Sequence, residues 1–130
     1  VSLPTRRSRV RPPLPAPDVM SDLAKKKCVV CDGSIPAFDT SQIHKYLKKV
    51  DGWDVKSNEK NNFYLIKNFK FTDFEKSKKF TDQISILAEE ENHHPDISFG
   101  WGYCKVKIFT HSIKGLAESD FILAAKIDKI

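Results

Sequence analysis

The amino-acid sequence predicts an α+β fold: a two-layer sandwich with the element order α-β-β-α-β-β-α, in which helices cover one face of a four-stranded antiparallel sheet. Two observations lead to this prediction. Three segments carry apolar residues at helical spacing, and each gap between them contains two short stretches in which apolar and polar residues alternate. Hairpins that alternate with helices pack most economically in two layers.

The first helix is expected to follow Asp39, a candidate N-cap because Gln42 lies three residues further on. Asp51-Gly52 is expected to end this helix. A hairpin should follow, with one strand at 53–56, a polar turn at 57–61 and a longer second strand. The apolar face of the helix consists of Ile43, Tyr46, Leu47 and Val50, and that of the longer strand of Phe63, Leu65, Phe69 and Phe71.

The second helix is expected to open with a capping box formed by Thr72 and Glu75 and to end before Pro95. Alternation then resumes up to Thr110 and predicts a second hairpin, loosened by glycines near its middle. A last helix is expected from about Gly115. The apolar stripe of the second helix is Phe80, Ile84, Leu87 and Ala88, and that of the last helix is Leu116, Leu123, Ile127 and Ile130.

The positive charge of the chain is concentrated at its start. The formal net charge of +5 lies entirely in residues 1–27, whereas residues 28–130 carry equal numbers of basic and acidic side chains. Affinity for a phosphate backbone comes from clustered lysines and arginines, so direct nucleic-acid binding is not expected. No apolar run approaches the roughly 20 residues of a membrane helix, so no membrane association is expected either.

Two regions are distinguished: a flexible basic leader at 1–27 and a folded domain at 28–130. The leader is rich in proline and arginine and lacks an apolar pattern. It is either a transit-like sequence for an organelle or a set of residues that precede a native start at Met20.

The three cysteines, Cys28, Cys31 and Cys104, are expected to remain reduced thiols. This favours an intracellular location in the cytoplasm, with the nucleus or an organelle as alternatives. The Cys28-x-x-Cys31 spacing has a metal or redox interpretation, but the second pair of a full site is missing, and packing is the alternative.

The histidines are the strongest candidates for chemistry. His93 and His94 follow an acidic stretch where the second helix should end, and His111 follows the last strand, so all three could reach one place. A helix C-terminus favours the imidazolium form through its dipole. Each histidine taken alone could equally be a capping residue, and His44 is assigned to that class.

Two carboxylates could support these histidines. Asp120 lies on or beside the apolar face of the last helix, where it would need a hydrogen-bonding partner, unless it only interacts with the helix dipole. Glu89 precedes His93 by four residues on the same helical face and could orient its ring. A zinc site built from these groups is a weaker alternative, because the adjacent His93-His94 pair makes joint coordination awkward, and no metal is expected.

The pattern Glu89-x-x-x-His93-His94-Pro95, followed by Trp101, His111 and Asp120, resembles the signature of the pterin-4a-carbinolamine dehydratases. The similarity covers about residues 28–128. It extends to Gly52-Trp53, to Phe109-Thr110-His111, and to the segment from Gly115 to Asp120. One position departs from it, because many members carry an arginine where this chain has Ser119.

The resemblance implies a lyase that dehydrates 4a-hydroxytetrahydrobiopterin to quinonoid dihydrobiopterin. By this likeness His93 and His111 form the acid–base pair and His94 contacts the pterin. Glu89 would orient His93, Asp120 would hold His111 or a neighbouring group, and Trp53 and Trp101 would wall the site unless they only pack in the core. No cofactor is expected, because the pterin is the substrate.

The resemblance also implies assembly into a homodimer or a homotetramer. The strand Phe63–Phe71 is the expected dimer edge. An alternative function is that of a dimeric binding module with a helical protein partner, because animal members of the family act as dimerisation cofactors of a homeodomain transcription factor.

Overall fold

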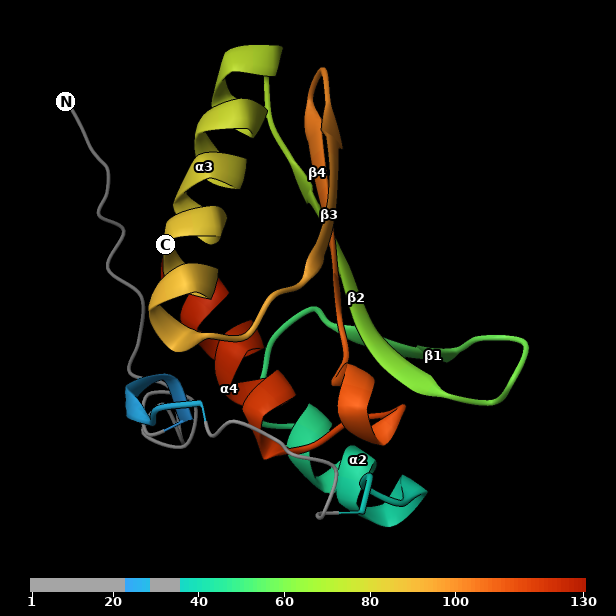
Figure 1. Ribbon diagram of the computed structural model, residues 1–130. Helices are drawn as coiled ribbons and strands as arrows, with labels where there is room; N and C mark the ends of the chain where they lie inside the picture. The colour runs from blue at the N-terminus through green and yellow to red at the C-terminus, as the bar shows by residue number, and fades with distance from the viewer. Residues whose placement is uncertain (1–22, 29–35) are drawn as a thin grey trace, which may run out of the picture.

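The computed structural model of the protein describes residues 23–28 and 36–130. Its helices and strands follow the expected order, and the strands form one antiparallel sheet in the order β1-β2-β4-β3 (Figure 1). The predicted α+β class is therefore confirmed. The elements are α2 (Thr40–Leu47), β1 (Asp54–Ser57), β2 (Phe63–Lys70), α3 (Phe74–Glu91), β3 (Asp96–Gly100), β4 (Tyr103–Ile108), the 3-10 helix η1 (His111–Ile113) and α4 (Glu118–Ile127).

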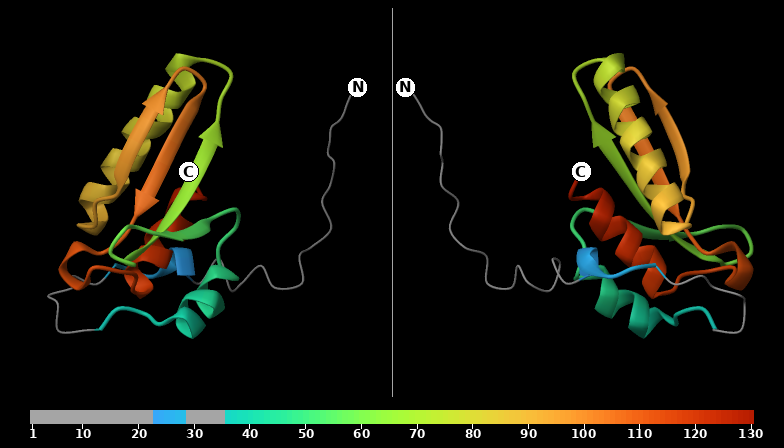
Figure 2. Two further views of the ribbon diagram at one scale, coloured as in Figure 1. Left: turned by 90° about the vertical axis from the view of Figure 1, so that its right-hand side faces the viewer. Right: turned by 60° about the vertical axis from the view of Figure 1, so that its left-hand side comes forward.

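The core lies between the sheet and the two longer helices, α3 and α4. Figure 2, left, shows α3 behind strands β3 and β4, and within the described ranges no helix lies in front of them. Side chains that alternate along each strand reach this core, as the pleat of a strand requires. The fully buried members on the strands are Leu65, Cys104, Val106 and Ile108, and those on α4 include Phe121 and Leu123.

The helix α2 begins as the sequence predicts. The Asp39 carboxylate accepts the backbone N–H of Gln42 at 2.8 Å, and the Gln42 side chain accepts the N–H of Asp39. The helix ends earlier than expected, at Leu47 rather than at Asp51. The chain then turns until Gly52, whose φ of +78° is a conformation that glycine adopts without strain.

The N-cap of α3 differs from the expectation. The cap is Asp73 rather than Thr72, because the Asp73 carboxylate accepts the backbone N–H of Lys76 at 2.8 Å. The Thr72 hydroxyl instead accepts a hydrogen bond from the Lys76 ammonium group. A charged carboxylate interacts more favourably than a hydroxyl with the positive end of a helix dipole, which explains the choice.

The last helix begins at Glu118 rather than near Gly115. The segment before it contains η1, and hydrogen bonds between Thr110 and Gly115 close the turn around η1. Because this turn follows directly on β4, it places His111 just beyond the end of the sheet. Ile130, expected on the apolar face of the last helix, lies after its end and is 43% exposed.

The strand β2 is not the free edge that the sequence suggested. It pairs with β4 over Leu65–Lys70 and with β1 over Phe63–Ile66, so it lies between two strands, and Leu65 and Ile66 are paired on both sides. Only Lys67–Lys70 extends beyond the pairing with β1. The pairing with β1 therefore limits the edge that β2 could offer to a second copy to these four residues.

The described part of the basic leader contacts the domain. Leu23 is 3% exposed, and the Lys126 ammonium donates to the backbone carbonyl of Ala24 at 2.7 Å. Residues 23–27 are thus packed on α4, while the rest of the expected leader, 1–22, lies outside the described residues. None of the helices in the described parts of the chain is both long and apolar enough to cross a bilayer.

Candidate active site

The histidine pair stands where α3 ends. Asn92 adopts the left-handed conformation with φ of +52°, and the N–H groups of Asn92 and His93 bond back to carbonyls of the last helical turn. This is a common way for a helix to stop, and it reverses the chain. The reversal directs His93 and His94 away from the helix axis before Pro95 leads into β3.

His93 is held by Asp120 across the fold. The His93 Nε2 lies 2.7 Å from Asp120 Oδ1, and the two side chains are 13% and 0% exposed. The other Asp120 oxygen accepts the Thr110 hydroxyl and the N–H of Ala117, both at 2.8 Å. An ionised carboxylate only accepts hydrogen bonds, so Nε2 of a neutral His93 carries the proton and Nδ1 remains free to accept one.

This geometry corrects the expected role of Glu89 and specifies that of Asp120. Glu89 does not orient His93: its carboxylate bonds Nε2 of His94, and both of these side chains are exposed. Asp120 was expected to hold His111 or a neighbouring group, and it holds Thr110, which directly precedes His111, together with His93. The reason is the left-handed turn at Asn92, which takes His93 off the helical face that Glu89 occupies.

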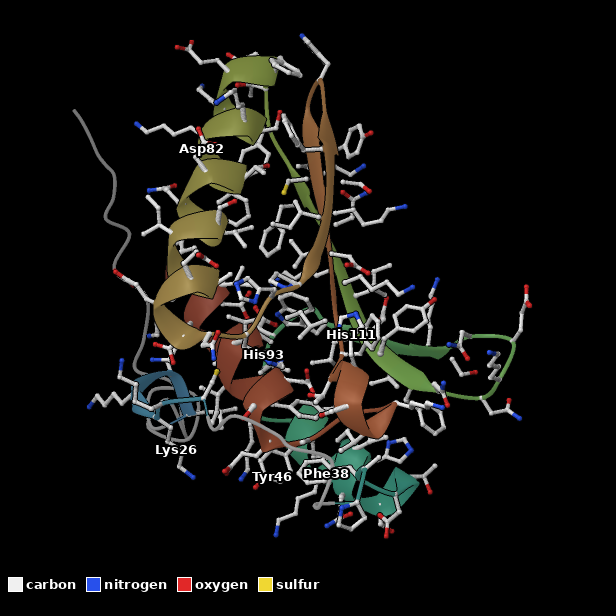
Figure 3. All side chains as sticks on the ribbon, viewed as in Figure 1. Lys26, Phe38, Tyr46, Asp82, His93 and His111 are labelled. Atoms are coloured by element: carbon white, nitrogen blue, oxygen red, sulfur yellow. The ribbon has the colours of Figure 1, made fainter. Side chains whose placement is uncertain are left out.

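His111 joins the site from a different element. It opens η1, and its ring centroid lies 4.3 Å from that of Phe109. Figure 3 shows His93 and His111 approaching the same region, one from the end of α3 and the other from the end of β4. A hollow of about 440 Å³ lies between them. Its lining residues are Asn92, His93, His94, Phe109, Thr110, His111 and Ser112. The three histidines predicted to converge are therefore brought together.

The structure does not bring either tryptophan to this hollow. Trp53 is buried in the core, where its indole N–H donates to Asp128 at 3.0 Å and its ring meets Phe69. Trp101 is 71% exposed in the turn between β3 and β4, at the opposite end of these strands. The alternating pattern placed it in a strand, but Gly102, with φ of +81°, closes a tight turn there.

Sequence reasoning missed Thr110 as the partner of Asp120. A signal was present, because Thr110 continues the inward-facing alternation of Val106 and Ile108 and is itself 5% exposed. A buried hydroxyl needs a hydrogen-bonding partner, and Asp120 was the other polar residue expected to face the core. Asn92 and Ser112, which also line the hollow, carry no comparable sequence signal.

A second polar cluster surrounds Glu91, the last residue of α3. The Glu91 carboxylate accepts the N–H of Cys28 at 3.0 Å and lies near the ammonium groups of Lys126 and Lys27. Burial alone would raise the pKa of Glu91, but the hydrogen bond and the two cations outweigh it and hold the pKa below its ordinary value. This cluster ties the segment before Cys28 to the helix end that carries the histidines.

The cysteines show no sign of activation. Burial, followed by the nearby Glu91 carboxylate, raises the pKa of the Cys28 thiol to about 12, and burial also raises the pKa of Cys104. Cys31 lies outside the described residues. Within the described ranges, no group of three or more histidine, cysteine, aspartate or glutamate side chains is placed to hold a metal ion.

Known proteins resemble this chain in both sequence and fold. The family described as pterin 4 alpha carbinolamine dehydratase matches residues 36–130. A protein of Rubrobacter xylanophilus that carries this enzyme name provisionally is 41% identical over 85% of this chain and 100% of its own length. A protein of Rickettsia bellii with the same provisional name is 46% identical over 85% of this chain and 95% of its own.

Two solved structures are also similar. A protein of Brucella melitensis described as a transcriptional coactivator/pterin dehydratase superposes with a TM-score of 0.64 and 28% identity, over 72% of this chain and 96% of that one. A pterin dehydratase-like protein identified as a RuBisCO assembly factor in the alpha-carboxysome gives a TM-score of 0.51 and 25% identity, over 60% and 87% of the two chains. On the family match and the near-complete alignment with its relatives, this chain belongs to the pterin 4 alpha carbinolamine dehydratase family.

Proposed function

We propose that this protein is a hydro-lyase that dehydrates 4a-hydroxytetrahydrobiopterin to quinonoid dihydrobiopterin by histidine acid–base catalysis, and so recycles the pterin. The observation that supports this proposal most directly is the convergence of three imidazoles on one hollow. One of them, His93, is fixed by a carboxylate with no exposed surface. The family and the names of the relatives point to the same reaction.

The reaction needs two proton transfers. The C4a–O bond breaks and its electron pair leaves with the hydroxyl, which requires a proton to depart as water. The proton on N5 is lost, and its electrons form the new double bond to C4a. A positioned acid or base typically accelerates such a step about 10²–10⁴-fold. Imidazole exchanges protons near neutral pH, so it can serve both transfers.

We assign the two transfers to His93 and His111, which both line the hollow. Asp120 stabilises the imidazolium form of His93 and fixes its ring. His94 lines the same hollow and is assigned to contact with the pterin. The pterin is the substrate, so the proposed reaction uses no separate cofactor and no metal.

The size of the hollow is compatible with a small bicyclic substrate. Its volume of about 440 Å³ falls within the range of about 300–1,000 Å³ that is usual for small-molecule sites. The test is to generate the 4a-hydroxy compound freshly, add the protein and follow the quinonoid product by absorbance. A rate no faster than that in buffer would reject the proposal.

A second candidate function is that of a binding module, as a transcription-factor dimerisation cofactor or a similar assembly factor. It is favoured by the two solved structures, one described as a coactivator and the other as an assembly factor. A homodimer or homotetramer would suit this role, and light scattering would size it. A stoichiometric complex with a helical partner protein, together with absent turnover, would favour this candidate over the enzyme.

A further inference from the structure

A second hollow lies on the other side of His111. Its volume is about 590 Å³, and it shares two walls, Phe109 and His111, with the histidine hollow. Its remaining walls come from two separate places: the loop between β1 and β2, and the end of η1 (Figure 1). We call it the side groove. Its lining residues are Ser57, Asn58, Glu59, Lys60, Asn62, Phe109, His111 and Lys114.

The loop wall of the side groove is organised by its own hydrogen bonds. The Asn58 side-chain oxygen accepts the backbone N–H groups of Lys60 at 2.8 Å and of Asn62 at 3.0 Å. The Asn58 backbone bonds to both Asn61 and Asn62, and Asn61 takes the left-handed conformation with φ of +61°. Because these bonds are local, the wall forms without any ligand.

The charge of the side groove is positive and comes from both walls. Lys60 stands on the loop and Lys114 on η1, against the single carboxylate of Glu59. In the part of the chain that the structure describes, neither lysine side chain takes part in an ion pair. Lys114 also holds a left-handed backbone with φ of +54°, which is uncommon for a residue other than glycine. Such positions concentrate where a side chain has a functional placement.

The chemistry of a pterin links the two hollows. N5 is bonded to both C4a and C6, and C6 carries the variable side chain of natural pterins. If the histidines reach the hydroxyl on C4a and the proton on N5, the C6 side chain must begin beside them. The space that adjoins His111 on its far side is the side groove. The ring system and its side chain would then occupy adjoining spaces.

We propose that the side groove binds the C6 side chain of the substrate, and that Lys60 and Lys114 select side chains that end in an anionic group. The inference rests on the proposed dehydratase function and adds a substrate preference to it. A phosphate ester and a carboxylate share the chemistry that two ammonium groups recognise. Exposed charge pairs contribute modestly, so the preference is expected to be about tenfold in kcat/KM.

The test compares three substrates, each in its 4a-hydroxy form. These are tetrahydrobiopterin, whose side chain is neutral, a tetrahydropterin whose side chain carries a phosphate ester, and one whose side chain ends in a carboxylate. The wild-type protein should favour one or both anionic substrates, and the two anionic arms show which group fits better. In the double variant Lys60→Gln, Lys114→Gln the ratio of anionic to neutral kcat/KM should fall to about one, and salt should lower the wild-type ratio.

Lys79→Gln is the matched control, because Lys79 is an exposed lysine on α3 that lines neither hollow. Its ratio should equal that of the wild type. Equal efficiency on all three substrates, or a preference that survives in the double variant, would overturn the side-chain assignment alone. The double variant should have the same molecular mass in light scattering as the wild type. A different mass would also overturn the assignment, because it would show that the side groove contacts a second copy of the chain. A wild-type protein that dehydrates none of the three would overturn the dehydratase function as well.

Discussion

His93 Nε2 and Asp120 Oδ1 lie 2.7 Å apart, although 27 positions separate the residues in the chain. The carboxylate comes from the first turn of α4, where it also accepts the N–H of Ala117, so one side chain both starts a helix and holds a ring of the site. The other imidazole pair, His94 with Glu89, is exposed on both sides. Both pairs join an imidazole to a carboxylate, and burial distinguishes them.

Asp120→Asn should lower kcat by about 100-fold, because the amide keeps the shape of the carboxylate but cannot stabilise an imidazolium. KM should change much less, since Asp120 does not line the hollow. Steady-state kinetics of the folded variant check the split. Glu89→Gln serves as the comparison: its pair is exposed, so the fall in kcat should be smaller. Equal effects of the two substitutions would contradict the role given to Asp120.

The double variant His93→Ala, His111→Ala should remain folded and approach the uncatalysed rate of dehydration. Both side chains belong to the proposed acid–base pair, and His111 is exposed, so its loss leaves no cavity in the core. Circular dichroism checks the fold, and the absorbance assay checks the rate. His44→Ala is the control, because His44 lies exposed on α2 and should keep wild-type activity. Substantial turnover by the double variant would show that other groups carry the protons.

Glu91→Gln should reduce the free energy of unfolding by about 1–2 kcal/mol near neutral pH. The neutral amide accepts a weaker hydrogen bond than the buried carboxylate and does not attract the two nearby ammonium groups. The pKa of Glu91 is lowered in the folded protein. Its stabilisation is therefore present above the pKa of the unfolded chain and is lost as the pH falls through the folded value.

Urea unfolding of both proteins over a pH series checks this effect. The difference in stability between wild type and Glu91→Gln should be largest near neutral pH and should shrink as the solution becomes more acidic than the ordinary carboxyl pKa of 4.5. A difference that stays constant down to the acid limit would show that the charge of Glu91 is not what stabilises the end of α3.

Cys28 should react very slowly with iodoacetamide in the native protein. Its pKa is raised from 9.0 to about 12, so at a given pH below 9 it holds about a thousandfold less thiolate than an ordinary thiol. The measurement uses a Cys31→Ser variant, so that alkylation followed by mass spectrometry reports on Cys28 and the buried Cys104. Both thiols should react readily once the chain is unfolded in denaturant. Rapid labelling of the native protein at Cys28 would contradict the packing of residues 23–28 on the domain.

The sequence predicted most of the fold because its signals are local. The spacing of apolar residues predicted the helices α2, α3 and α4 and the four strands in their observed order, but not η1, and the capping box at Asp39 was confirmed. Errors occurred where two neighbouring residues could serve the same purpose, as at Thr72 and Asp73. They also occurred where a turn interrupts a regular pattern, as at Trp101, since a short hairpin turn can sit inside an alternating stretch.

The sequence also predicted one part of the candidate site and not the other. His93, His94 and His111 could be chosen from the sequence, because histidines at the ends of predicted elements are conspicuous and the family resemblance marks them. Their carboxylate partners could not be assigned. Pairing depends on the directions that the side chains take after the left-handed turn at Asn92, where the adjacent residues His93 and His94 bond to different carboxylates.

By itself, then, the sequence determined the order of the elements, the apolar faces that form the core, and the three imidazoles available for chemistry. Only the tertiary structure decided which carboxylate holds which ring and that a second hollow adjoins His111. The physical reason is range. Periodicity and capping act within a few residues, whereas the packing of α3 against α4 and the hollow between η1 and the β1–β2 loop depend on how distant segments pack.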